Sequence, residues 1–72
     1  MVWVLERNSD IITCEIRQVP NSTDYEFEVA NPHGPTETSR FGSATELING
    51  YLRRQIVLES QGWRPRATAN EL

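Results

Sequence analysis

Two stretches of the chain alternate between apolar and polar residues, and this pattern limits the fold more than any other feature. Residues 11–19 and residues 25–29 both place apolar side chains at every second position. A period of two is typical of a strand with one buried face and one face in water. The segment 20–24 between them holds proline, asparagine and aspartate, which favour a turn. We therefore expect two antiparallel strands whose apolar face is buried against another part of the chain.

The charges on the polar face favour one register for this pair of strands. If residues whose numbers sum to 43 face each other, Arg17 lies opposite Glu26, and opposite charges across a pair are stabilising. A sum of 41 preserves the two faces but places Glu15 opposite Glu26, where like charges repel. We expect the first register, which also pairs Cys14 with Val29.

Two further segments have strand character. Residues 2–7 are rich in β-branched, aromatic and aliphatic residues and are followed by the turn sequence Asn-Ser-Asp. Residues 36–41 follow a loop with two prolines, and they are short and polar, which suits an edge strand anchored by Phe41. In the first strand, Trp3 either completes the buried side of the sheet or projects as an aromatic anchor, and the buried position is favoured.

Signals for both ends of a helix follow these strands. Ser43 and Glu46 form a capping box, so the helix should begin directly after Ser43. Gly62 suits the left-handed position after a helix, and Trp63 is then placed to contact Leu58, as in a Schellman motif. These signals predict one helix that extends almost to Gly62.

The helix is expected to dock on the sheet through one stripe. Apolar residues keep helical spacing through the Asn49-Gly50 pair, although such a pair often marks a hairpin. Glycine inside a helix costs only about 1 kcal/mol relative to alanine, so we predict that the helix continues. Arg53 and Arg54 lie away from the centre of the stripe, which consists of Ala44, Leu47, Ile48, Tyr51, Leu52, Gln55 and Leu58.

Together these elements predict one α+β domain over residues 1–63. It is a four-stranded antiparallel β-meander followed by a C-terminal amphipathic helix on one face of the sheet, and residues 64–72 are expected to form a disordered tail. A domain this small gains from a disulfide, a metal or an oligomeric partner. One cysteine, Cys14, excludes an internal disulfide, and Cys14 with His33 falls short of the four ligands of a structural zinc. Self-association is then the remaining way to stabilise the domain.

Charge and composition disfavour several classes of function. The net charge of −3 repels a phosphate backbone at long range, so nucleic-acid binding is disfavoured. No apolar run approaches the length of a membrane span, and the first residues lack the regions of a signal peptide, so we expect a cytoplasmic protein without membrane contact. The glycines are isolated rather than grouped in a phosphate-binding loop, and no cofactor is expected.

Side chains capable of catalysis do not form a recognisable motif. The candidates outside the glutamates are Cys14, Ser22, Asp24 and His33, and none has a supporting group at a diagnostic spacing. Cys14 lies on the apolar face of its strand, where a thiol packs as a small hydrophobe. A single loop histidine such as His33 is usually solvated. We therefore assign no catalytic residue or metal ligand and do not expect an enzyme.

Three glutamates, Glu15, Glu26 and Glu28, are expected on the wet face of the sheet. They could hold a cation or act as an acid and base, but alternating acidic residues are ordinary on a half-wet sheet, and Arg17 neutralises one of them. An enzyme or ligand-binding domain is accordingly the third hypothesis. It would gain support if His33 and these glutamates lined one pocket.

A candidate interface lies on the helix, outside the docking stripe. Ile56 and Val57 should be exposed in a monomer, and Gly50 precedes Val57 by one heptad. Two aliphatic side chains beside a position without a side chain would let a second helix approach. The leading hypothesis is therefore a small, non-enzymatic interaction or accessory module that forms a homodimer or binds another protein.

The order of four antiparallel strands and a helix over residues 2–62 resembles the PC4 and Whirly single-stranded-DNA-binding domains, which also dimerise. This resemblance implies single-stranded nucleic-acid binding as the second hypothesis. Such binders use a cationic sheet face with stacking aromatics, whereas the wet face expected here is mostly acidic. The basic residues available for this function lie on the helix and tail, and they are Arg53, Arg54, Arg64 and Arg66.

Overall fold

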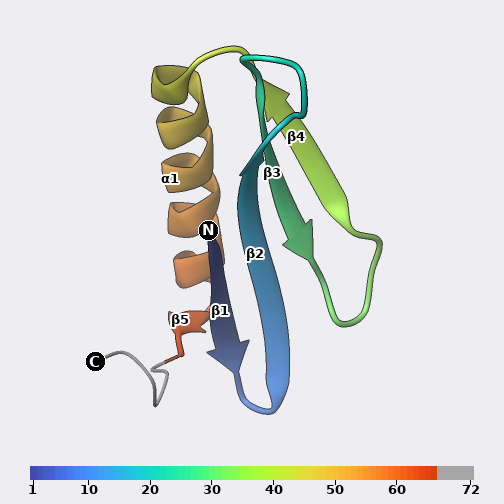
Figure 1. The fold of residues 1–72 in the computed structure, drawn as a ribbon. Helices are drawn as coiled ribbons and strands as arrows, with labels where there is room; N and C mark the ends of the chain where they lie inside the picture. The colour runs from blue at the N-terminus through green and yellow to red at the C-terminus, as the bar shows by residue number, and fades with distance from the viewer. Residues whose placement is uncertain (67–72) are drawn as a thin grey trace, which may run out of the picture.

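One antiparallel sheet with a helix on one face makes up the fold (Figure 1), as described for residues 1–66 by a computed structural model. The strand order is β4-β3-β2-β1-β5, and the first four strands form the predicted meander. The elements are β1 (Val2–Arg7), β2 (Asp10–Gln18), β3 (Tyr25–Ala30), β4 (Glu37–Phe41), α1 (Ala44–Ser60) and β5 (Arg64–Pro65). The predicted α+β class is confirmed.

The register of the central strand pair is the one that the charges favoured. Cys14 pairs with Val29 and Arg17 pairs with Glu26, so paired residue numbers sum to 43. The Nε atom of Arg17 donates to Oε1 of Glu26 at 3.1 Å. Because a one-residue slip would move every apolar side chain to the wet face, this register also keeps the apolar face of β2 and β3 toward the helix.

Both ends of α1 follow the predicted capping chemistry. The Oγ atom of Ser43 accepts a hydrogen bond from the amide of Glu46 at 3.2 Å, so the first turn has its cap. Gly62 has a φ of 97°, and the amide of Trp63 donates to the carbonyl of Leu58 at 3.1 Å, the long-range bond of a Schellman motif. These caps fix where the helix begins and ends.

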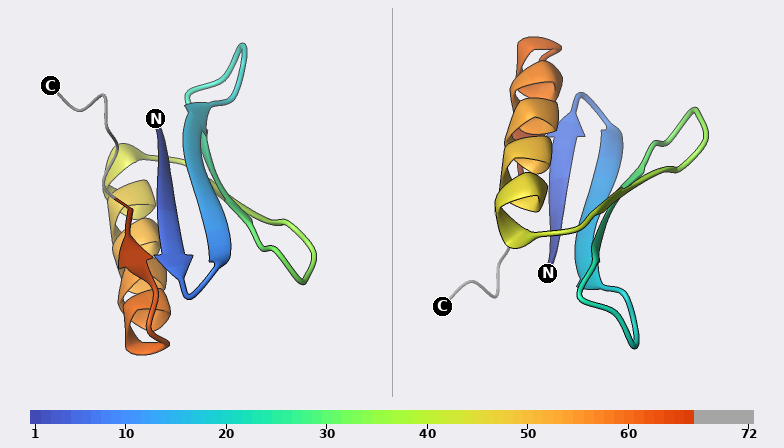
Figure 2. Two further views of the ribbon diagram at one scale, coloured as in Figure 1. Left: turned by 90° about the horizontal axis from the view of Figure 1, so that it is seen from below. Right: turned by 90° about the horizontal axis from the view of Figure 1, so that it is seen from above.

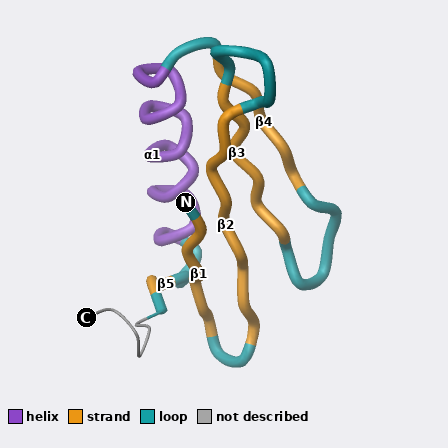
Figure 3. The backbone as a smooth tube through the Cα atoms, in the orientation of Figure 1, coloured by secondary structure: helices purple, strands orange, loops and turns teal. Residues whose placement is uncertain are grey.

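The prediction of a disordered tail over residues 64–72 is wrong for its first residues. Arg64–Pro65 forms β5, which pairs antiparallel with β1, and the amide of Arg66 donates to the carbonyl of Val4 at 2.9 Å. Figure 3 shows β5 beside β1. The reversal after the helix brings these residues to an edge of β1 that can accept their hydrogen bonds. Residues 67–72, the rest of the expected tail, lie outside the described residues.

The core lies between α1 and the inner face of the sheet. Trp3 packs against its edge, with its ring stacked on Phe27 at a centroid distance of 5.9 Å and tilted against Tyr51 at 5.7 Å. Trp3 is half-buried here, which agrees with its predicted place on the buried side of the sheet. The buried residues are Leu5, Ile12, Cys14, Phe27, Val29, Leu47, Leu58 and Trp63.

The helix is rotated relative to the predicted docking stripe. Leu47 and Leu58 are buried as expected, but Ile48 and Leu52 are 48% and 45% exposed. The reason is the contact between α1 and β4, since a Cβ atom at Gly50 would lie 2.4 Å from the ring of Phe41. The glycine side of the helix therefore faces β4, and the side with Ile48 and Leu52 turns outward. Figure 2 shows the helix on one face of the sheet, with the β3–β4 loop extending away from it.

Candidate functional site

Three exposed aliphatic side chains follow one line along α1. Ile48, Leu52 and Ile56 are spaced by four residues, and Ile56 is 67% exposed. Residues four apart lie on one side of a helix, one above the other. We call these three residues the aliphatic stripe.

The structure places the two aliphatic residues of the predicted interface, Ile56 and Val57, on different sides of α1. Ile56 and Val57 are exposed as expected, but consecutive residues point about 100° apart around a helix. Val57 lies on the same side as Gly50, which is already in contact with Phe41. The spacing from Ile48 to Ile56 is visible in the sequence, but the apolar periodicity predicted Ile48 and Leu52 in the docking stripe.

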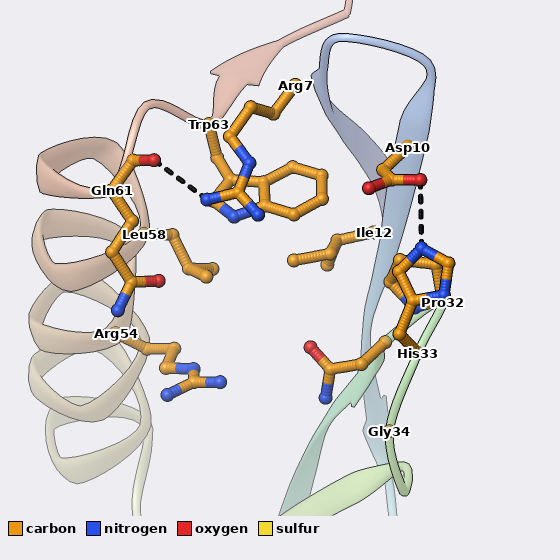
Figure 4. Close-up of a pocket in the computed structure, with 11 residues that line it drawn as sticks. Arg7, Asp10, Ile12, Pro32, His33, Gly34, Arg54, Leu58, Gln61 and Trp63 are labelled. Carbon is orange, nitrogen blue, oxygen red and sulfur yellow. Dashed lines mark hydrogen bonds and ion pairs between the residues drawn. The ribbon is translucent and has the colours of Figure 1, made fainter.

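A cavity of about 290 Å³ opens between the C-terminal half of α1 and the loop after β3 (Figure 4). We call it the cleft. Its apolar side is formed by Ile12, Leu58 and Trp63. Its charged and titratable side chains are Arg7, Asp10, His33 and Arg54.

Two pairs of contacts hold side chains at the opening of the cleft. The guanidinium carbon of Arg7 lies 4.6 Å from the centre of the Trp63 ring, and Nη1 of Arg7 donates to the carbonyl of Gln61 at 2.9 Å. On the opposite side, Nε2 of His33 lies 3.1 Å from Oδ1 of Asp10. Figure 4 shows these two pairs facing each other across the opening. The loop histidine is therefore tied to a strand residue.

Arg54 occupies the inner wall of the cleft. Helical periodicity predicted Arg54 away from the centre of the docking stripe, yet its side chain extends from α1 over the sheet and binds the carboxylate of Glu37 on β4. Its Nε atom is buried and has no hydrogen-bond partner among residues 1–66. A second hollow of about 370 Å³ lies on its other side, against Phe27 and Val29. Arg54 thus stands between two cavities.

The outer face of the sheet carries the acidic residues that were considered for catalysis. Arg17 contacts Glu15, Glu26 and Glu28 at 3.4, 3.1 and 3.0 Å. The hydrogen bond with Glu28 raises the pKa of Arg17. Because these side chains lie on the face opposite the cleft, they do not share a pocket with His33. The arrangement that would have favoured an enzyme is not formed.

The remaining catalytic candidates lie in the β2–β3 loop and interact locally. The Oγ atom of Ser22 accepts a hydrogen bond from the amide of Asp24 at 3.0 Å, and the carboxylate of Asp24 binds Arg40 at 2.8 Å. Within residues 1–66 no group of three or more potential metal ligands lies close together.

The four arginines of the nucleic-acid hypothesis lie in separate environments. Arg54 faces the cleft, whereas Arg53 lines a separate hollow of about 230 Å³ beside Phe41. Arg64 donates to two backbone carbonyls, and Arg66 lies 3.9 Å from Glu6. The nucleic-acid hypothesis therefore rests on arginines that already contact other groups or point in different directions.

Cys14 is fully buried on the inner face of β2. Burial raises the pKa of its thiol from 9.0 to about 11, and the charge of Arg54 offsets part of that shift. At pH 8 the folded chain should therefore hold about 100-fold less thiolate than an exposed cysteine would. We expect slow labelling by a disulfide reagent at pH 8 and rapid labelling in urea. Immediate labelling of the folded chain would show that Cys14 is accessible.

The raised pKa of the Cys14 thiol also predicts the direction in which stability changes with pH. The thiolate forms at lower pH in the unfolded chain than in the folded chain, so the contribution of Cys14 is complete below pH 9.0 and is lost as the pH rises toward about 11. Cys14→Ala should unfold with a weaker dependence on pH over this interval. Equal pH profiles for the two proteins, measured by urea titration, would contradict the assignment.

Comparisons with protein-family profiles, curated proteins and solved structures gave no significant match. The resemblance to the PC4 and Whirly plan therefore rests on the order of the elements alone. Over residues 1–66, α1 is neither long nor apolar enough to cross a membrane.

Proposed function

We propose that this protein is a small, non-enzymatic interaction module that self-associates through the aliphatic stripe of α1. The observation that supports this function is the exposure of Ile48, Leu52 and Ile56 in one line on α1, whereas Val57, the other exposed large aliphatic residue of the helix, lies alone on another side. Contiguous exposed apolar patches on small proteins mark interaction surfaces more often than single exposed residues do.

The stripe suits a second copy of the same chain because it is symmetric about Leu52. If two helices pair antiparallel with Leu52 at the twofold axis, Ile48 of one copy lies opposite Ile56 of the other. The same patch then serves both subunits, which is the requirement for an isologous dimer. The core holds eight buried apolar side chains among residues 1–66, and this adds a reason for self-association because small domains gain stability from oligomerisation.

The expected dimer is weak. Each copy offers three aliphatic side chains that are 45% to 67% exposed, so the interface between two stripes is small. Small interfaces give weak association, and we expect a dissociation constant in the range of about 100 µM to 1 mM.

The test is the solution mass across a concentration series from about 10 µM to about 2 mM. Leu52→Glu places a charge at the centre of the stripe and should give a monomer throughout. Val57→Glu is the matched control, because Val57 is 42% exposed against 45% for Leu52 but lies about 140° away around the helix. It should leave the dimer intact.

Two results would contradict this proposal. If the wild-type chain stays monomeric over the whole series, the stripe does not mediate self-association. Loss of the dimer in Val57→Glu, with its retention in Leu52→Glu, would move the interface to the side of Val57 that the sequence analysis favoured. Circular dichroism of both variants should show that the fold is retained.

A further inference from the structure

Basic side chains outnumber acidic ones in the lining of the cleft, although the chain as a whole is acidic. The lining holds two arginines, Arg7 and Arg54, against a single carboxylate, Asp10, whereas the net charge of the chain is −3. Asp10 is also occupied by its contact with His33 at 3.1 Å. An excess of charge of one sign in a concave site favours ions of the opposite sign. The lining therefore suits an anion better than a cation.

Arg54 has hydrogen-bonding capacity that the described chain does not use. A guanidinium carries five N–H donors in a planar fork, and Glu37 is its only hydrogen-bond acceptor among residues 1–66. The side chain of Glu37 is 54% exposed at the edge of the sheet, so this ion pair is solvated. A buried N–H without an acceptor costs about 1–3 kcal/mol. An anionic group entering beside Arg54 would find unused donors.

The other wall of the cleft is apolar and includes one aromatic ring. Ile12, Leu58 and Trp63 line it, and the guanidinium of Arg7 lies against the Trp63 ring. Cavities that bind small molecules are mostly apolar with a few placed polar groups, and they have volumes of about 300–1,000 Å³. The cleft, at about 290 Å³, lies at the small end of this range. It has room for a single ring with a short substituent rather than for a nucleotide.

We propose that the cleft binds a small organic anion, with its acidic head beside Arg54 and Arg7 and its apolar body against Leu58 and Trp63. Carboxylate and phosphate heads share the chemistry that a guanidinium fork recognises. The site is independent of the aliphatic stripe, because Arg54 points about 160° away from Leu52 around the helix. Binding is therefore expected in the monomer as well as in the dimer.

The experiment is a titration of the full chain, labelled with ¹⁵N, followed by NMR. The probes are phenylacetate, phenyl phosphate and benzyl alcohol, which share a ring and differ in the head group. We expect saturable shifts of the Trp63 indole and the Leu58 amide with at least one of the two anions. Benzyl alcohol should bind at least about tenfold more weakly, since charge-assisted hydrogen bonds are about twice as strong as neutral ones. The tighter of the two anions identifies the head group.

Two neighbouring arginines provide a matched pair of variants. Arg54→Met keeps the apolar stem and removes the charge in the cleft, and it should weaken binding of the better anion at least about tenfold. Arg53→Met makes the same change at a position outside the cleft and should alter the affinity less than about twofold.

Several results would overturn the proposal. These are the absence of saturable binding of either anion, equal binding of benzyl alcohol, and equal loss of affinity in Arg53→Met and Arg54→Met. If Arg54→Met does not fold, the shift map of the wild-type chain decides the question. Shifts centred on Trp63 and Leu58 support the site, and shifts centred on any other surface overturn it.

Discussion

Trp63→Ala is expected to lower the free energy of unfolding by about 3–5 kcal/mol, the range for removing a large aromatic side chain from a core. Trp63 is 4% exposed and lies directly after the turn that ends α1. The guanidinium of Arg7 also packs against its ring. The substitution therefore removes core area and a cation–π contact at the residue that leads into β5.

Because small domains have a total stability of only a few kcal/mol, Trp63→Ala should be largely unfolded at 37 °C. Urea denaturation followed by circular dichroism measures the change. Arg64→Ala is the control, since it alters the next residue, which is exposed, and should cost less than about 1 kcal/mol. A loss below about 1 kcal/mol in Trp63→Ala would mean that this residue is peripheral to the fold.

Gly50→Leu is expected to destabilise the chain by about 2–3 kcal/mol, although leucine favours helix by about 0.8 kcal/mol over glycine. A Cβ atom alone would lie 2.4 Å from the Phe41 ring, so the larger side chain must push β4 away from α1. Overpacking of this kind costs about 1–3 kcal/mol. Thermal and urea denaturation give the size of the loss.

Shortening the opposing side chain should reverse this effect. Phe41→Ala alone should cost about 2 kcal/mol, because Phe41 is only partly buried. The double substitution of Gly50→Leu with Phe41→Ala restores the volume between helix and strand, and it should recover most of the stability lost by either change. Additive losses in the double variant would show that the two positions do not contact each other.

The features that could be predicted from the sequence depend on groups close together in the chain or on charge pairing. Ser43 caps the helix through a residue three positions away, and Trp63 completes the Schellman motif with Leu58 five positions away. The register between β2 and β3 follows from one pair, Arg17 with Glu26. In each case both interacting residues can be identified from the sequence, so no knowledge of the three-dimensional arrangement is needed.

The rotation of α1 could not be found from apolar periodicity. Ile48 and Leu52 look like core residues and Arg54 does not, yet Arg54 lies over the sheet. A long arginine stem can cover apolar surface while its charged head reaches a solvated partner. The decisive contact is that of Gly50 with Phe41, and it depends on the distance between α1 and β4.

The cleft and β5 need the same kind of long-range information. Arg7, His33 and Arg54 come from a strand, a loop and the helix, and no spacing in the sequence relates them. Pro65 cannot donate to a β-ladder. It is tolerated in β5 because, among residues 1–66, β5 is an edge strand that pairs with β1 alone.

The pairing of β5 with β1 affects how the chain can fold as it leaves the ribosome. Leu5 emerges before its cross-strand partner Pro65, which is about 60 residues behind it. At about 5–20 residues per second, that interval is about 3–12 s. The β1 edge is therefore open throughout synthesis of the sheet and helix. This domain therefore completes its sheet only after Pro65 has emerged, and until then the β1 edge is available to pair with another strand.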